Sequence, residues 1–151
     1  CAKNQWSIVI SNFCSEDIID NHINNYLEHS ELKKNEALKK IKLSKLIFVS
    51  EDKKDLEKRL LDDESPYLKV VDVIYNKLKT FNKHQCFGEN LKDSSEALKS
   101  ICLFGDPDQV KDKVLKYKTK YGSLSSIVFV DVPKTNLKEY DKSLELFAKY
   151  V

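Results

Sequence analysis

A continuously apolar stretch near the middle of the chain reads Leu46-Ile47-Phe48-Val49. Two similar stretches occur elsewhere, Ile8-Val9-Ile10 near the start and Ile127-Val128-Phe129-Val130 near the end. All three are rich in β-branched residues and contain no polar residue. Continuous runs of this kind are typical of strands buried on both faces, as in a parallel sheet. We therefore predict about three parallel strands.

Each of these runs is followed by a segment with helical periodicity. Apolar residues gather on one helical face over 18–27, 56–61, 70–81 and 137–148, and Pro66 separates the second of these helices from the third. This alternation predicts an α/β fold with helical, right-handed crossovers between parallel strands. Three strands cannot close into a barrel, so we expect the chain to form part of a larger sheet.

The most complete helix start reads Gly105-Asp106-Pro107-Asp108-Gln109. Asp106 is suited to cap the free amides, Pro107 to occupy the first helical position, and Gln109 to complete a capping box. Between the helices, the stretch from Thr80 to Ser100 loses its periodicity. We predict a long loop over 80–100 with about one helical turn, and loops of this length often form lids or binding loops.

The length, composition and charge of the chain limit the classes of protein to which it can belong. A chain of 151 residues can bury about two-thirds of its unfolded surface, and 41% hydrophobic with 33% charged residues excludes a disordered tail. We therefore treat 1–151 as a single segment. Its 26 basic and 24 acidic residues are interleaved and Arg59 is the only arginine, so no nucleic-acid-binding face is predicted.

Several kinds of site and location are disfavoured. The three glycines lie too far apart for a phosphate-binding loop, and the four cysteines lack the spacing of a zinc site. The apolar runs are too short to span a membrane, and no leader precedes them, so we expect a cytoplasmic protein without membrane contact. Because the chain begins with Cys1 and contains no methionine, we expect a processed product or part of a longer chain.

Four segments appear in an order that resembles the C-terminal half of the luciferase-like, flavin-dependent monooxygenases. They are the strand ending Ile8-Val9-Ile10-Ser11, the strand 46–49, the helix start 105–110 and the tail 143–151. Two of them carry family motifs, a Gly-x-Pro-Glu-like turn in which Asp108 replaces the glutamate, and the closing segment Leu146-Phe147-Ala148. The family has Val-Pro after that segment, whereas this chain stops at Val151.

The resemblance implies a fold and a function. The fold is a (β/α)8 TIM barrel, of which this chain would be the C-terminal half, with the 80–100 stretch where the family has a mobile loop over the active site. The function is that of an FMN-dependent oxidoreductase: reduced flavin from a flavin reductase reacts with O2, and the resulting flavin hydroperoxide oxygenates a small organic substrate.

The resemblance also implies that this segment is incomplete. In the family, most groups that hold the FMN phosphate and ring come from the preceding half. We therefore expect the chain to be inactive alone and to associate with the missing N-terminal half or as an oligomer. A different interpretation stays open, in which the chain is a non-catalytic α/β module that associates with a partner chain.

Candidate site residues are suggested by the position of barrel active sites at the carboxyl ends of the strands. Ser11 and Asn12 resemble pocket residues beside the flavin, although they are equally suited to end a strand and cap the next element of the chain. Ser50, Asp131 and His84 are candidates for lining a substrate. We predict no catalytic residue and no metal ligand, and Cys14 has no neighbouring base that would make it a nucleophile.

Overall fold

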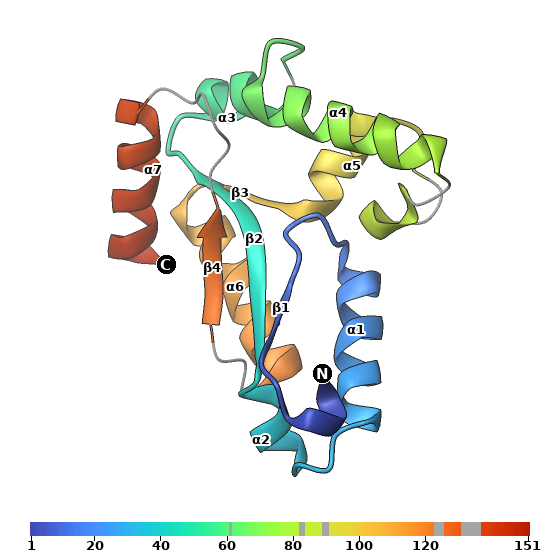
Figure 1. Cartoon of the computed structure of the whole chain (residues 1–151). Coiled ribbons are helices and arrows are strands. Elements are labelled where there is room, and N and C mark those ends of the chain that lie inside the picture. The colour runs from blue at the N-terminus through green and yellow to red at the C-terminus, as the bar shows by residue number, and fades with distance from the viewer. Residues whose placement is uncertain (61, 82–83, 89–90, 123–125, 131–136) are drawn as a thin grey trace.

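The structure is a computed structural model, and it describes residues 1–60, 62–81, 84–88, 91–122, 126–130 and 137–151. Strands and helices alternate along the chain (Figure 1), which confirms the predicted α/β class. The strands are β1 (Ile8–Ile10), β2 (Ile41–Val49), β3 (Cys102–Gly105) and β4 (Ser126–Val130). All their pairings are parallel.

Seven α-helices and two short 3-10 helices lie in the described ranges. The α-helices are α1 (Glu16–Glu28), α2 (Lys34–Leu38), α3 (Lys53–Leu60), α4 (Pro66–Thr80), α5 (Ser94–Ile101), α6 (Pro107–Tyr121) and α7 (Leu137–Tyr150). The 3-10 helices are η1 (Ala2–Asn4) and η2 (His84–Phe87). Within the described part of the chain, no helix has the length and apolar character needed to cross a membrane.

Strand β2 is the centre of the sheet and pairs with all three other strands. At Leu43 its partners are Ile10 of β1 and Ile127 of β4, so these two strands lie on opposite edges. Strand β3 pairs with β2 from Leu46 onward, opposite the end of β4. Thus β1 and β3 follow one another along one edge of β2, and β4 occupies the other.

The three predicted strands lie within β1, β2 and β4, and the described residues add a fourth strand, β3. Strand β2 is also longer than predicted, because Lys42, Ser44 and Lys45 interrupt the apolar pattern of its first half. Strand β3 was not predicted, because its apolar residues follow directly on the apolar residues of α5 with no turn between them.

Alternate residues of β2 enter two separate hydrophobic cores. One set of side chains, which includes Leu43 and Ile47, packs with α1 and α6, and we call this the first core. The other, which includes Leu46 and Phe48, packs with α3, α4 and α5 in the second core. Figure 1 shows α4 running across the sheet above the end of β2. Each core removes apolar surface from water and so contributes the main driving force for folding.

Side-chain hydrogen bonds tie the outer helices to this arrangement. The hydroxyl of Ser143 in α7 accepts the amide of Val49 at 2.9 Å, at the end of β2. On α1, Asp20 accepts from Lys120 of α6 at 2.6 Å and from the Tyr121 hydroxyl. Burial alone would raise the pKa of the Asp20 carboxyl, but these two hydrogen bonds and the positive charges of Lys120 and Lys116 together outweigh it and hold the pKa below its ordinary value.

The predicted long loop over 80–100 contains more structure than its sequence indicated. Helix η2 covers His84–Phe87, and α5 begins at Ser94 with Asp93 accepting the amide of Glu96 at 2.9 Å. Phe87 is fully buried, and its carbonyl accepts from Ser100 at 2.6 Å. One helical turn is compatible with the prediction, but the loop prediction is wrong for the residues of α5, because the short apolar repeat of this helix and its Asp93 cap were not recognised. A lid role for 80–100 stays a prediction.

Lys45 is an unusual member of the first-core side of β2, because its side chain is 0% exposed. Its ammonium donates to the carbonyl of Cys14 at 3.0 Å and lies 5.6 Å from the ring centroid of Tyr117. Burial lowers the pKa of Lys45 from 10.5 to about 8, and the neighbouring Cys14, Glu16 and Cys102 oppose this shift. Holding this charge inside the fold costs stability at neutral pH.

We expect Lys45→Met to be more stable than the wild type at pH 7. A lysine pKa lowered by folding means that the unfolded chain binds the proton more tightly, so the Lys45 penalty is complete below pH 8 and is relieved between pH 8 and 10.5. At about 1.4 kcal/mol per pKa unit, the advantage of the variant should shrink by about 3 kcal/mol across that range. Urea denaturation of both proteins at several pH values measures this. A stability advantage of Lys45→Met that does not change with pH would contradict the lowered pKa of Lys45.

Candidate functional site

The carboxyl ends of β2 and β3 lie side by side. Val49 is paired with Gly105, and the amide of Ser50 donates to the Gly105 carbonyl at 3.1 Å. A pocket of about 290 Å³ opens here, between these strand ends and the starts of α3 and α6. Its lining residues are Ser50, Glu51, Lys53, Leu56, Glu57, Leu60, Phe104, Gly105, Asp106 and Gln109. We call it the Ser50 pocket.

Ser50 lines this pocket, at the strand end where its position in the sequence predicted it. Its side chain is buried, and the hydroxyl donates to a carboxylate oxygen of Asp55 at 3.0 Å and accepts the amide of Asp52 at 3.2 Å. A hydroxyl has one donor and two acceptor positions. Since Asp55 takes the donor, Ser50 could offer a ligand only one further acceptor. Its role in lining a substrate stays a prediction.

The opposite wall of the Ser50 pocket is the start of α6. Here the predicted capping box is confirmed: Asp106 accepts the amide of Gln109 at 2.9 Å, and the Gln109 side chain accepts the amide of Asp106 at 3.1 Å. Gly105 permits this closure, because its φ of +151° is strained for other residues and a Cβ there would lie 2.5 Å from the Gln109 side-chain oxygen.

The described residues of the Ser50 pocket do not fit the phosphate of FMN. A helix N-terminus can bind a phosphate through its free amides, but at α6 the Asp106 and Gln109 side chains occupy two of them. The pocket also carries the carboxylates of Glu51, Glu57 and Asp106 against the single cation of Lys53. A phosphate dianion would therefore be repelled, and we assign no chemical step through FMN to these residues.

Ser11 and Asn12 lie directly after β1, but they are not close to Ser50. Strand β1 ends opposite Leu43, six residues before β2 ends at Val49, a separation of about 20 Å at 3.3 Å per residue. Ser11 is exposed, and its hydroxyl accepts the amide of Phe13 at 3.2 Å in the turn after the strand. Residues that end strands commonly make such a hydrogen bond, and a role for either residue beside a flavin stays a prediction.

The two remaining candidates are not tested by the geometry. The backbone of His84 belongs to η2, and Asp131 lies outside the described residues. The buried thiols offer no activated nucleophile: burial raises the pKa of Cys14, with Cys86 adding to the effect and Lys45 opposing it. Burial also raises the pKa of Cys102 to about 12.

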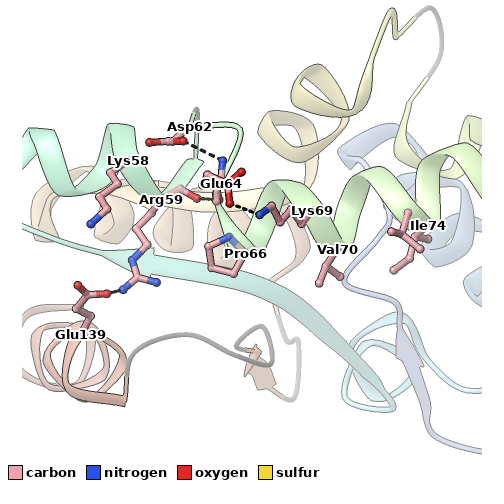
Figure 2. A pocket seen from close by; sticks show the side chains of 11 residues that line it. Lys58, Arg59, Asp62, Glu64, Pro66, Lys69, Val70, Ile74 and Glu139 are labelled. Atoms are coloured by element: carbon pink, nitrogen blue, oxygen red, sulfur yellow. Dashed lines mark hydrogen bonds and ion pairs between the residues drawn. The ribbon is translucent and has the colours of Figure 1, made fainter.

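A larger pocket, of about 730 Å³, lies between the end of α3, the first part of α4 and the start of α7 (Figure 2). We call it the Arg59 pocket, because the buried Arg59 of α3 forms an ion pair there with Glu139 of α7. Neither Arg59 nor Glu139 was predicted as a site residue from the sequence. The only available signal was that Arg59 is the single arginine of the chain, and nothing local connects it with a residue so far away in the sequence.

Comparison with known proteins gives a likeness in fold. The oxygenating constituent of 3,6-diketocamphane monooxygenase from the CAM plasmid of Pseudomonas putida, a type II Baeyer-Villiger monooxygenase solved in complex with FMN, matches with a TM-score of 0.69 and 16% identity. The match covers 95% of this chain and 40% of that chain. Monooxygenase RslO1 from Streptomyces bottropensis matches with a TM-score of 0.58 and 12% identity, over 99% of this chain and 42% of that one.

These matches confirm the predicted resemblance at the level of fold, and the chain spans about two-fifths of each protein that it matches. No family model and no curated protein matches the sequence. At such identities the likeness concerns the fold alone, so it supports an α/β segment that corresponds in fold to part of a longer chain.

We expect Gly105→Ala to destabilise the chain by about 2 kcal/mol, because the added Cβ meets the Gln109 side chain and disturbs the capping box. Gly122→Ala is the matched control. Its φ of +69° is also unfavourable for alanine, but nothing lies within 4 Å of the added Cβ, so it should cost only about 1 kcal/mol. Urea denaturation followed by circular dichroism compares the two. An equal or smaller loss for Gly105→Ala would contradict the proposed close contact.

Proposed function

We propose that this chain is the C-terminal part of an FMN-dependent, luciferase-like monooxygenase and is inactive on its own. The observation that carries the proposal is the extent of the fold match, which takes in 95% of this chain but only 40% of a monooxygenase solved with FMN. Fold alone does not establish activity. The four family segments and their order in the sequence are the second line of support.

The sheet supports an incomplete domain. In the described chain, β1, β3 and β4 each pair only with β2, so each has an open edge. Val9 of β1 is 62% exposed, and its partner Lys42 on the same face is exposed too. Open parallel edges and an uncovered apolar side chain are unusual for a sheet that functions alone. We propose that further strands of the parent protein cover them.

The charges around the Ser50 pocket bear on which part of the parent protein holds the FMN phosphate. The carboxylates around the Ser50 pocket disfavour a phosphate, so we propose that the part preceding this chain holds the FMN phosphate. This chain would contribute Ser11 and Asn12 beside the flavin and Ser50, His84 and Asp131 near a small organic substrate. The proposal also includes O2 as a reactant and a flavin reductase as the source of reduced flavin. It places the parent protein in the cytoplasm.

A second function remains open, that of a non-catalytic α/β module that associates with a partner chain. The open strand edges and the exposed Val9 favour association as such, whether or not a flavin is involved. The two proposals differ in what the assembled protein does, so flavin binding and association of the chain have to be measured separately.

We expect the isolated chain to bind FMN more weakly than about 10 µM, measured by calorimetry. Riboflavin, which lacks the phosphate, should bind no more weakly than FMN, because the Ser50 pocket carries more carboxylates than cations and so disfavours the phosphate. Submicromolar FMN binding, or a clear preference for FMN over riboflavin, would show that the phosphate site lies in this chain.

We expect the chain to self-associate at micromolar concentration in sedimentation velocity. Val9→Asp should shift the profile toward monomer, because it places a charge on the exposed face of an edge strand. Leu115→Asp is the matched control, since Leu115 is a similarly exposed apolar residue on α6. A wild-type chain that stays monomeric would contradict the association and favour a module that is stable alone.

A further inference from the structure

We propose that the Arg59 pocket binds a neutral, largely apolar small molecule that carries one oxygen able to accept a hydrogen bond. Its volume of about 730 Å³ lies within the range of about 300–1,000 Å³ that is usual for small-molecule sites. The inference goes beyond the proposed function, because it would hold in a chain that never meets a flavin. Three features of the described residues support it.

The first feature is an apolar wall on α4. Pro66, Val70, Val73 and Ile74 line the pocket at helical spacing. Tyr67, Val71 and Tyr75 are buried in the second core, and the half-buried Val70 and Ile74 pack against the edge of that core as well. Figure 2 shows Pro66, Val70 and Ile74 along this side of α4. A helix that packs on one core needs a single apolar stripe. Beyond that stripe, Val73 is 66% exposed, and together with the exposed parts of Pro66, Val70 and Ile74 it leaves apolar surface for a ligand to cover.

The second feature is a fixed hydrogen-bond donor at one end of the pocket. The Arg59 side chain is only 7% exposed, pairs with Glu139 and lies 5.5 Å from the ring centroid of Phe48. Its main-chain carbonyl accepts from the hydroxyl of Ser65, the residue that caps α4. A guanidinium has five N–H donors in a rigid fork. One carboxylate does not use them all, so an acceptor oxygen on a ligand can take another.

The third feature is the balance of charge. Three cations, Lys58, Arg59 and Lys69, face three carboxylates, Asp62, Glu64 and Glu139. Two ion pairs are already formed, Arg59 with Glu139 and Lys69 with Glu64. A carboxylate, sulfonate or phosphate on the ligand would compete with Glu139 for the guanidinium and add an uncompensated charge. A neutral carbonyl oxygen avoids that cost, so the balance selects an uncharged ligand.

The test is a titration of the ¹⁵N-labelled chain monitored by NMR, with 2-octanone as the neutral probe and octanoate as an anion of the same length. We expect 2-octanone to shift the amides of 67–74 saturably, and octanoate to bind at least tenfold more weakly. Val73→Trp should fill the pocket and weaken 2-octanone binding at least tenfold. Because Val73 is exposed, the variant should keep its fold, and Leu115→Trp is the matched control with unchanged binding.

The Arg59→Lys variant tests the hydrogen-bond donor at one end of the Arg59 pocket. It keeps a positive charge for Glu139 but removes the fork of donors, so 2-octanone binding should weaken at least threefold while the amides of α4 still respond. The proposal would be overturned if octanoate bound as tightly as 2-octanone, if neither probe shifted the amides of 67–74, or if Val73→Trp left 2-octanone binding unchanged. FMN binding is measured in a separate experiment, so the result of that experiment does not decide whether the Arg59 pocket binds a neutral ligand.

Discussion

The parallel pairing of β2 with three other strands is the constraint on which the rest of the molecule depends. Its nine residues hold β1 and β3 along one edge and β4 along the other, and its alternate side chains enter the two cores. A slip of one residue would exchange the two sets of side chains between the cores. The burial of Lys45 on this strand shows how firmly the register is held, because the fold keeps a lysine inside rather than shifting the strand.

This arrangement also determines where a ligand can bind. In a barrel with strands of similar length, the carboxyl ends converge on one site. Among the described strands, β1 ends level with Leu43 and β4 level with Leu46, while β2 and β3 end together at Val49 and Gly105. The pocket at that shared end is small and acidic, while the larger Arg59 pocket is built by helices that meet beyond the sheet. The pocket at the strand ends and the pocket between the helices therefore differ in the kind of ligand that each can bind.

Patterns within a few residues predicted much of the fold. The capping box at Asp106 and Gln109 and the strand runs at 8–10, 46–49 and 127–130 are all present. The candidate site was predicted less completely: Ser50 lines a pocket, Ser11 and Asn12 lie apart from it, and Arg59 and Glu139 were not proposed. Capping and periodicity act over one helical turn or one strand, and no such local rule connects α3 with α7.

The amino-acid sequence by itself determined the three strand runs at 8–10, 46–49 and 127–130 and the start of α6, because each of these depends on residues close together in the chain. The sharing of one edge of β2 by β1 and β3, the burial of Lys45 and the meeting of Arg59 with Glu139 came only from the tertiary structure. These depend on which distant segments pack together, a choice set by the total apolar surface that the whole chain can bury.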